Sequence, residues 1–426
     1  MGFAMTAYAA ASSIAYPFIE GWLRKRHAEG FDERQGMYPA WKIERLKPGK
    51  TLWLHAVSVG EVQAARPIAD KIAASGWDGA VLLSTVTETG AQNADMLMGP
   101  KIAARVFAPW DIPRITRRAA DAIGPAVYAT VETEVWPNIL FEMKRRGIPA
   151  LLINGRISDR SLARAKMAMP LLKEAYGLFD ALLARSEEDA ARMSFMGAER
   201  SRITVTGDTK VDAIIERRES AAPKIHGLRE KILPGGGVCF VAGSTHPGED
   251  EAVLEAFGRL RAGNDPLEGA KLVIVPRHPA RSEEILQKAR LKCSAELYSN
   301  LRGPLEADIL IVDVIGTLFE LYGLATAAFI GGSLVPRGGQ NILEPAIWDV
   351  PVLHGPHMEN FARHASELDA AGMSFRVETA DDIERLWRLV ADDAIPRKEG
   401  SRGYFAANSG AAERTLAVLG RYLALP

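Results

Sequence analysis

The sequence predicts an α/β protein in which two Rossmann-like, doubly wound domains face each other across a cleft. Short apolar runs alternate with longer helical patterns along almost the whole chain, as expected for buried parallel strands joined by helices. The pattern occurs twice, and 426 residues are too many for one ordinary core, so we expect two domains. Polar side chains and glycines follow several runs, which places candidate binding groups at the carboxyl ends of strands.

Residues 1–30 are predicted to form a membrane-associating helix. Its first 23 residues have no charged side chain before Glu20 and are followed by Arg24, Lys25 and Arg26. A secretory signal begins with positive charge instead, so export is not expected. Aromatic residues beside a basic flank favour a helix at the cytoplasmic surface of a membrane, either lying on the bilayer or anchored in it. The alternative is a helix that packs on its own domain.

The first domain is expected over 31–213 and the second over 238–426, with the option that the last helix crosses back to the first domain. Between them, 214–237 is charged and then rich in Pro and Gly, which is typical of a linker. The strand-like runs of the first domain are TLWLHAV (51–57), AVLLST (80–85), AVYATV (126–131) and PALLIN (149–154). Those of the second domain are GVCFVAG (237–243), KLVIVP (271–276), ADILIVD (307–313), AAFIGG (327–332) and PVLHG (351–355).

Composition excludes several classes of protein. The 52 basic and 53 acidic residues nearly balance, so there is no electrostatic case for nucleic-acid binding. The two cysteines, Cys239 and Cys293, fit a reducing compartment and exclude a disulfide scaffold or a cysteine metal cluster. The histidines show no HxH or HxxxH spacing, so we expect neither a metal site nor a bound cofactor.

Acidic residues follow two strands of the first domain. The strand before Ser58 and Gly60 stops there, and Glu61 begins a helix, whose N-terminus should keep the carboxylate ionised. Glu61 is either a general base or an ordinary acid of a first helical turn. Glu132 and Glu134 follow another strand, and strand alternation would place both on one face, beside a helix whose amides could bind them.

Arg156 lies just beyond a further strand of the first domain. Its guanidinium could bind an anionic acceptor in two-pronged geometry, or it could form a structural ion pair that holds Glu132.

The second domain contains a glycine-rich segment that is typical of a nucleotide-sugar pocket. After the strand that ends near Phe329, glycines would let the main chain approach a phosphate, and helix-opening amides would face its charge. Glu344 in the same segment could accept hydrogen bonds from ribose hydroxyls. Two other loops at the same edge add candidate phosphate ligands, namely Gly243, Ser244, Thr245, His246, Arg277 and His278.

Seven segments, in order, resemble motifs of the 3-deoxy-D-manno-oct-2-ulosonic acid (Kdo) transferase family. The resemblance extends from about residue 30 to residue 365. The segments are SVGE (58–61), ETEVWPN (132–138), NGRISDRS (154–161), TGDTK (206–210), GSTHPGE (243–249), VPRHP (275–279) and GGSLVPRGGQNILEP (331–345). Two departures are Gln340, where the family commonly has His, and ERQG at 33–36.

The resemblance implies a two-domain GT-B fold and an inverting glycosyltransferase that moves Kdo from CMP-Kdo to a lipid A precursor. It implies a place in lipopolysaccharide synthesis at the cytoplasmic face of the inner membrane of a Gram-negative cell. Glu61 would be the catalytic base and Glu132 an essential neighbour. Support on the acceptor side would come from Ser58, Gly60, Glu134, Arg156 and Lys210. The donor, which is a substrate and not a cofactor, would bind Gly243, Ser244, Thr245, His246, Pro276, Arg277, His278, Gly331, Gly332, Ser333, Gly339, Asn341 and Glu344.

Two alternative functions remain open from the residues alone. A GT-B nucleotide-sugar epimerase would share the fold and need no lipid. A two-domain small-molecule binding protein would bind without catalysis.

Overall fold

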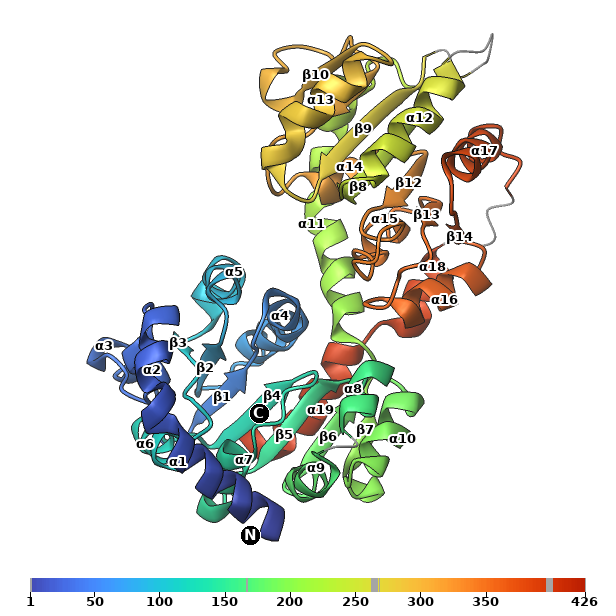
Figure 1. Cartoon of the computed structure of the whole chain (residues 1–426). Helices are drawn as coiled ribbons and strands as arrows, with labels where there is room; N and C mark the ends of the chain where they lie inside the picture. The colour runs from blue at the N-terminus through green and yellow to red at the C-terminus, as the bar shows by residue number, and fades with distance from the viewer. Residues whose placement is uncertain (1, 166–167, 262–266, 268, 396–400, 426) are drawn as a thin grey trace. The chain divides into compact units, whose positions relative to one another are not determined.

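The computed structural model describes residues 2–165, 168–261, 267, 269–395 and 401–425, and it divides into two compact units (Figure 1). Unit 1 comprises Met1–Ala213 and Asn408–Pro426, and unit 2 comprises Ile214–Ala407. Each unit contains one seven-stranded parallel sheet. The predicted α/β class with two doubly wound sheets is therefore confirmed.

The sheet of unit 1 has the strand order β3-β2-β1-β4-β5-β6-β7. Its strands are β1 (Thr51–His55), β2 (Ala80–Thr85), β3 (Ala104–Phe107), β4 (Val127–Val131), β5 (Ala150–Gly155), β6 (Ala181–Ala184) and β7 (Ile203–Val205). Chain order reverses between β1 and β4, which pair in parallel. In an open sheet of this kind, ligands bind beyond the carboxyl ends of the strands that flank such a switch point.

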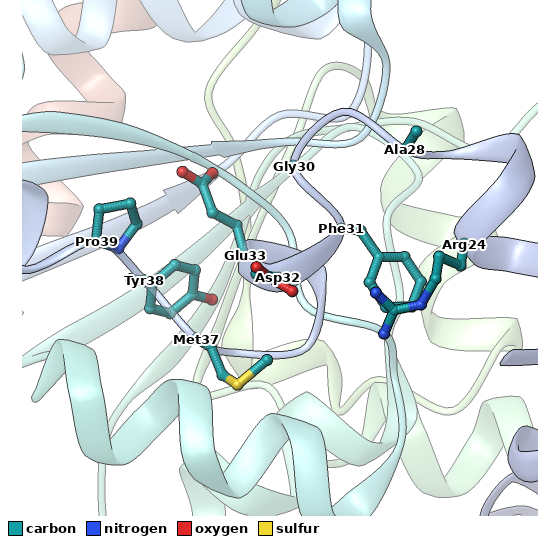
Figure 2. A pocket seen from close by; sticks show the side chains of 9 residues that line it. All are labelled: Arg24, Ala28, Gly30, Phe31, Asp32, Glu33, Met37, Tyr38 and Pro39. Carbon is teal, nitrogen blue, oxygen red and sulfur yellow. The ribbon is translucent and has the colours of Figure 1, made fainter. Parts of the chain in front are cut away.

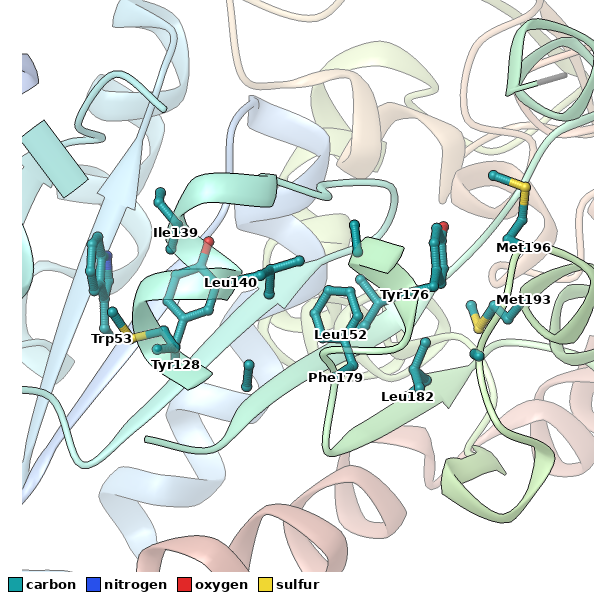
Figure 3. Packing of buried hydrophobic residues seen from close by; sticks show 14 of the residues in the cluster. Trp53, Tyr128, Ile139, Leu140, Leu152, Tyr176, Phe179, Leu182, Met193 and Met196 are labelled. Carbon is teal, nitrogen blue, oxygen red and sulfur yellow. The ribbon is translucent and has the colours of Figure 1, made fainter. Parts of the chain in front are cut away.

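The helices of unit 1 lie against both faces of the sheet. They are α1 (Phe3–Arg26), α2 (Phe31–Arg34), α3 (Ala40–Ile43), α4 (Val59–Ala74), α5 (Glu88–Met98), α6 (Pro113–Ile123), α7 (Pro137–Arg146), α8 (Asp159–Ala165), α9 (Met169–Tyr176), α10 (Glu187–Phe195) and α19 (Ala411–Leu423). Figure 3 shows one hydrophobic cluster of unit 1, which includes Trp53, Tyr128, Leu152 and Phe179. Each such buried side chain contributes about 1.5–3 kcal/mol, so these clusters fix the sheet that carries the site.

Helix α1 packs on unit 1 along one face. Met5, Tyr16 and Leu23 are buried, and the Glu174 carboxylate accepts hydrogen bonds from the first amides of the helix, Ala4 N and Met5 N, both at 3.1 Å. The opposite face leaves large apolar side chains exposed, namely Phe3, Ile14, Phe18 and Trp22. Within the described part of the chain, no helix has the length and apolarity that a membrane crossing requires.

The segment predicted as a linker, 214–237, is mostly helical. Helix α11 runs over Thr209–Ile232, because its Ala, Glu, Arg and Lys residues favour helix, and Pro223 is accommodated inside it. Three glycines with positive φ, Gly235 to Gly237, follow the helix. The C-terminal helix α19 belongs to unit 1, where Asp212 accepts hydrogen bonds from Gly410 N (2.7 Å) and Ala412 N (2.6 Å).

The sheet of unit 2 has the order β10-β11-β9-β8-β12-β13-β14, and its switch point lies between β8 and β12. Its strands are β8 (Cys239–Thr245), β9 (Lys271–Pro276), β10 (Ala295–Leu297), β11 (Ile309–Ile311), β12 (Ala327–Ile330), β13 (Val352–His354) and β14 (Ser374–Arg376). Its helices are α12 (Glu249–Arg261), α13 (Ser282–Arg290), α14 (Leu318–Tyr322), α15 (Leu343–Ala346), α16 (Ala362–Ala370), α17 (Ala380–Ala391) and α18 (Ser401–Asn408). In the core, Phe240 of β8 stacks on Trp387 of α17 with ring centroids 4.4 Å apart.

Candidate functional site

Glu61 lies in the first turn of α4, directly beyond the end of β1 at the switch point of unit 1. Only 7% of the residue is exposed. Its carboxylate turns back toward the loop and accepts a hydrogen bond from Val57 N. Val57 is itself fixed, because its carbonyl accepts hydrogen bonds from Val86 N (3.2 Å) and Thr87 N (3.1 Å). The backbone therefore holds this carboxyl group in one place.

Glu61 does not behave as the permanently ionised first-turn acid that the sequence predicted. Burial, followed by the nearby charges of Glu134 and Glu132, raises its pKa to about 8, although hydrogen bonds from the backbone oppose the shift. The prediction failed because desolvation and two neighbouring carboxylates outweigh the helix N-terminus. A carboxyl group with this pKa can exchange a proton near neutral pH.

Glu132 lies beyond β4, on the other side of the switch point, and its backbone has a φ of +60°. A left-handed conformation is uncommon for a residue with a side chain and tends to occur at functional sites. Two cations contact its buried carboxylate. Lys210 Nζ pairs with Oε1, and Arg156 Nε lies 3.6 Å from Oε2. Gly60 also lies close by, because a Cβ on it would be 3.8 Å from Lys210 Nζ. The structure thus brings together four predicted residues, namely Gly60, Glu132, Arg156 and Lys210.

Glu134 is held differently from Glu132. Strand β4 ends at Val131, so strand alternation does not position the two glutamates. The Glu134 carboxylate accepts a hydrogen bond from Trp136 Nε1 at 2.9 Å, and burial raises its pKa. The expected amides of the next helix are not available, because two of them donate to another carboxylate, Asp111.

Sequence reasoning missed the residues that hold Lys210. Asp208 accepts hydrogen bonds from Lys210 N (3.0 Å), Asn154 Nδ2 (3.3 Å) and Arg185 Nη1 (3.0 Å), and Asn154 Oδ1 accepts from Thr209 N (3.0 Å). One signal for them was present in the sequence, because Asn154 is a polar residue at the end of the strand-like run PALLIN. In the structure it adopts a φ of +51°, which Asn tolerates better than most residues.

Unit 2 gathers the predicted donor-side residues at its own switch point. Ser244 and Thr245 end β8, Pro276 ends β9, and Gly331 follows β12. Arg277 and His278 are exposed at this edge, where Arg277 N donates to Thr245 O at 3.0 Å. Because the three strands are parallel neighbours, these loops lie side by side.

His246 lies between these loops. Its ring contacts the His278 ring edge to face, with centroids 6.2 Å apart. Burial lowers the pKa of His246, and its Nε2 atom has no hydrogen-bond partner in the part of the chain that the structure describes. This nitrogen is therefore buried without a partner among the described residues.

The glycine-rich loop after β12 differs from the expectation that its amides would face a phosphate. Gly332 N and Ser333 N donate to the buried carboxylate of Glu249, at 2.7 and 2.9 Å. Gly331 permits this close packing, because a Cβ there would lie 2.2 Å from Ser244 O. Gly339 also packs closely, because a Cβ on it would lie 2.3 Å from Met358 Sδ.

Glu344 lies in α15 beside Arg217 of α11. Arg217 Nη1 donates to its Oε1 at 3.3 Å, and the same guanidinium stacks 4.1 Å from the centre of the Phe319 ring. Burial raises the pKa of Glu344, and the charge of Arg217 opposes that shift. Asn341 Oδ1 accepts a hydrogen bond from Leu343 N at 3.2 Å and so caps the start of this short helix.

A separate pocket of about 600 Å³ lies in unit 1 beside the end of α1 (Figure 2). Its walls include Arg24, Phe31, Glu33 and Tyr38. Glu33 is occupied by structure, because it pairs with Lys42 at 2.5 Å and accepts a hydrogen bond from the main chain of β3. No predicted site residue lines this pocket.

No group of three or more His, Cys, Asp or Glu side chains that could hold a metal ion occurs within the described ranges.

Comparison with known proteins gives the family. Residues 29–213 match the family model described as 3-deoxy-D-manno-octulosonic-acid transferase (kdotransferase). A 3-deoxy-D-manno-octulosonic acid transferase of Bordetella pertussis is 33% identical over 385 residues, which cover 87% of each chain. The chain belongs to this transferase family. A second Kdo transferase, from Haemophilus influenzae, is 29% identical over 93% of this chain and 92% of that one.

The Kdo transferase also shares its fold with enzymes of another activity. The structure of UDP-GlcNAc 2-epimerase from Neisseria meningitidis bound to UDP-GlcNAc covers 87% of this chain and 100% of that chain, with a TM-score of 0.60. At 12% identity this likeness shows the GT-B-like fold alone. The family membership confirms the transferase predicted from the motifs, and it decides against the epimerase and the binding protein.

Proposed function

We propose that this Kdo transferase moves Kdo from CMP-Kdo to a lipid A precursor, with inversion at the sugar carbon and with Glu61 as the general base. The observation that carries the proposal is the buried Glu61 carboxyl group at the switch point of unit 1, whose pKa is raised to about 8. A base of that strength is suited to remove a proton from a sugar hydroxyl as that hydroxyl attacks.

The reaction is a single displacement. The acceptor hydroxyl loses its proton to Glu61, and its oxygen forms a bond to the anomeric carbon of Kdo. The bond from that carbon to the CMP phosphate oxygen breaks, and CMP leaves with the electron pair. Because attack occurs opposite the departing phosphate, the configuration inverts. Lys210 and Arg156, which pair with Glu132, hold a second carboxylate beside the base, and the charge of Glu132 contributes to the raised pKa of Glu61.

On the donor side, we assign Arg277 to the phosphate and Glu344 to the ribose. Arg277 is exposed at the carboxyl end of β9 and its guanidinium is suited to bind phosphate oxygens. Glu344 is oriented by Arg217, which also favours its ionised form. Leaving-group charge can be stabilised by such donors without a metal.

We further propose that α1 places unit 1 on the cytoplasmic face of the inner membrane. Its exposed side chains include Phe3, Phe18 and Trp22, with exposed fractions of 89%, 86% and 56%. Arg24 and Lys25 follow in the last turn and would face anionic headgroups. An acceptor embedded in the bilayer would then reach the enzyme without leaving the lipid.

The experiment is incubation of the purified protein with CMP-Kdo, with and without a lipid A precursor. We expect release of CMP and formation of Kdo-lipid, detected by mass spectrometry, and only in the presence of acceptor. Glu61→Gln should lower turnover by roughly 100-fold or more. The matched control is Glu187→Gln, an exposed first-turn acid of α10, which should leave turnover unchanged. Formation of free sugar without lipid would contradict the proposal, and so would normal turnover by Glu61→Gln.

A further inference from the structure

Glu249, the last residue of the GSTHPGE segment, is a fully buried carboxylate that was not among the predicted site residues. It begins α12 and none of its surface is exposed. Its Oε2 accepts hydrogen bonds from His246 N (2.9 Å) and Gly332 N (2.7 Å), and its Oε1 accepts from Ser333 N and Leu334 N (both 2.9 Å). Four amides therefore surround one carboxylate, which is how proteins also bind phosphate.

Three further amides of the glycine-rich loop also have acceptors within the protein. Gly331 N donates to Gly243 O (2.8 Å), Gly339 N to Gly332 O (2.8 Å), and Gln340 N to Gly331 O (3.2 Å). A phosphate could bind these amides only if the loop gave up bonds that it already makes. Breaking the four bonds to Glu249 would leave a buried carboxyl group without partners, which is strongly unfavourable.

Side chains at the same edge are available instead. Arg337 is exposed within the loop, and a Cβ placed on Gly332 would lie 3.3 Å from Arg337 Cβ and 3.4 Å from His246 Cδ2. Arg277 is exposed at the end of the neighbouring strand β9. The charges of both arginines act on His246, so both guanidinium groups lie within electrostatic range of one point.

We propose that the donor phosphate is recognised by the side chains of Arg277 and Arg337, because Glu249 already occupies the loop amides that would otherwise bind it. Glu249 is then a positioning residue, which sets the loop in its binding conformation before the donor arrives. Arg337 is a further donor-binding residue. The inference rests on the proposed use of a CMP-linked donor and deepens it.

The first test measures hydrogen exchange of the wild-type protein with and without CMP. We expect the amides of Gly332, Ser333 and Leu334 to be protected already without ligand, and to change little when CMP is added. Weak protection that rises strongly with CMP would overturn the inference, because it would show that the ligand, and not Glu249, is their acceptor.

The second test compares CMP with cytidine, which lacks the phosphate, by calorimetry. Arg337→Ala should weaken CMP binding by about tenfold or more and leave cytidine binding unchanged. The matched control is Arg376→Ala, which removes an exposed arginine paired with Glu378 on the same unit. Equal CMP binding by Arg337→Ala and the wild type would overturn the assignment of Arg337.

Glu249 is tested by Glu249→Gln against Glu251→Gln, a partly exposed carboxylate two residues further along α12 that pairs with Lys288. We expect Glu249→Gln to weaken CMP binding by about tenfold and to raise exchange at 332–334, while Glu251→Gln does neither. Loss of stability with unchanged CMP affinity would assign Glu249 a purely structural role.

If Glu249→Gln does not fold, the exchange measurement on the wild type still decides whether Glu249 is the acceptor of the loop amides. Failure of the wild type to bind CMP would contradict the proposed function itself, whereas protection without ligand would still report on Glu249.

Discussion

At the scale of single residues, the proposed role of Glu61 as general base has a cost in stability. A carboxyl group whose pKa is raised from 4.5 to about 8 keeps its proton in the folded state where the unfolded chain has lost it. The folded state therefore loses relative stability as pH rises from about 4.5 through about 8. Glu61→Gln removes this titration, so the variant should be more stable than the wild type at pH 8 while being nearly inactive.

Thermal unfolding at pH 5 and pH 8 checks this prediction. The difference in Tm between Glu61→Gln and the wild type should grow with pH, and each gain of about 1 kcal/mol corresponds to roughly 2–4 °C. A difference that stays constant between the two pH values would show that Glu61 does not titrate in this range.

The same pKa predicts the pH dependence of catalysis. A general base works only when deprotonated, so kcat/KM should rise with pH and level off above about 8. A profile that is already flat from pH 6 upward would mean that Glu61 is ionised in the free enzyme, or that another group is the base.

Arg217 controls the charge of Glu344. Because Arg217 opposes the upward shift that burial imposes on the Glu344 pKa, Arg217→Met should let that pKa rise further. CMP binding by the variant should then be weaker than that of the wild type at pH 6, with a smaller loss at pH 8. Calorimetry at the two pH values measures this, and a loss that is the same at both would mean that Arg217 acts by contact alone.

At the scale of elements, α1 has one face that packs on unit 1 and one exposed apolar face, for which we propose a membrane contact. Its buried face contributes Met5, Tyr16 and Leu23 to the core of unit 1, so deleting the helix would damage the fold as well as any membrane contact. Substitution of the exposed face avoids this difficulty. Phe18→Ser combined with Trp22→Ser should reduce sedimentation with anionic vesicles and slow transfer to an acceptor in vesicles.

The control for α1 is Met96→Ser, which removes an exposed apolar side chain of α5. Transfer to a detergent-dispersed acceptor should be normal in the double variant and in Met96→Ser. Equal vesicle binding by the wild type and the double variant would leave α1 with only its packing role.

Elements also show what the sequence could predict and what it could not. Apolar runs located the strands that carry the site, because a strand buried on both faces needs apolar residues throughout. Strand ends then located Glu61, Glu132 and Arg277. The pKa of Glu61 and the role of Glu249 as an amide acceptor were not predictable, because each depends on groups from segments far apart in the sequence. The linker prediction treated a Pro- and Gly-containing segment as a connection, but helix-forming residues before Gly235 continue α11.

At the scale of the whole molecule, the attachment of α19 to unit 1 depends on Asp212. Its carboxylate accepts the amides of Gly410 and Ala412 at the start of that helix. Asp212→Ala should lower stability by about 1–2 kcal/mol, as the loss of a helix cap does, and thermal unfolding measures this. Glu219→Ala, an exposed change in α11, is the control and should have no effect.

Because the C-terminal helix α19 is part of unit 1, this unit can be completed only at the end of synthesis. Residues up to 213 leave the ribosome first, yet Leu419 and Leu423, which belong to one core of unit 1, are added about 200 residues later. At roughly 5–20 residues per second, the nascent unit 1 waits about 10–40 s for its last helix. Unit 2 is one continuous segment, so its synthesis is finished before unit 1 receives its last helix. During that interval a chaperone would find its binding surface on the side of the first sheet that α19 later covers.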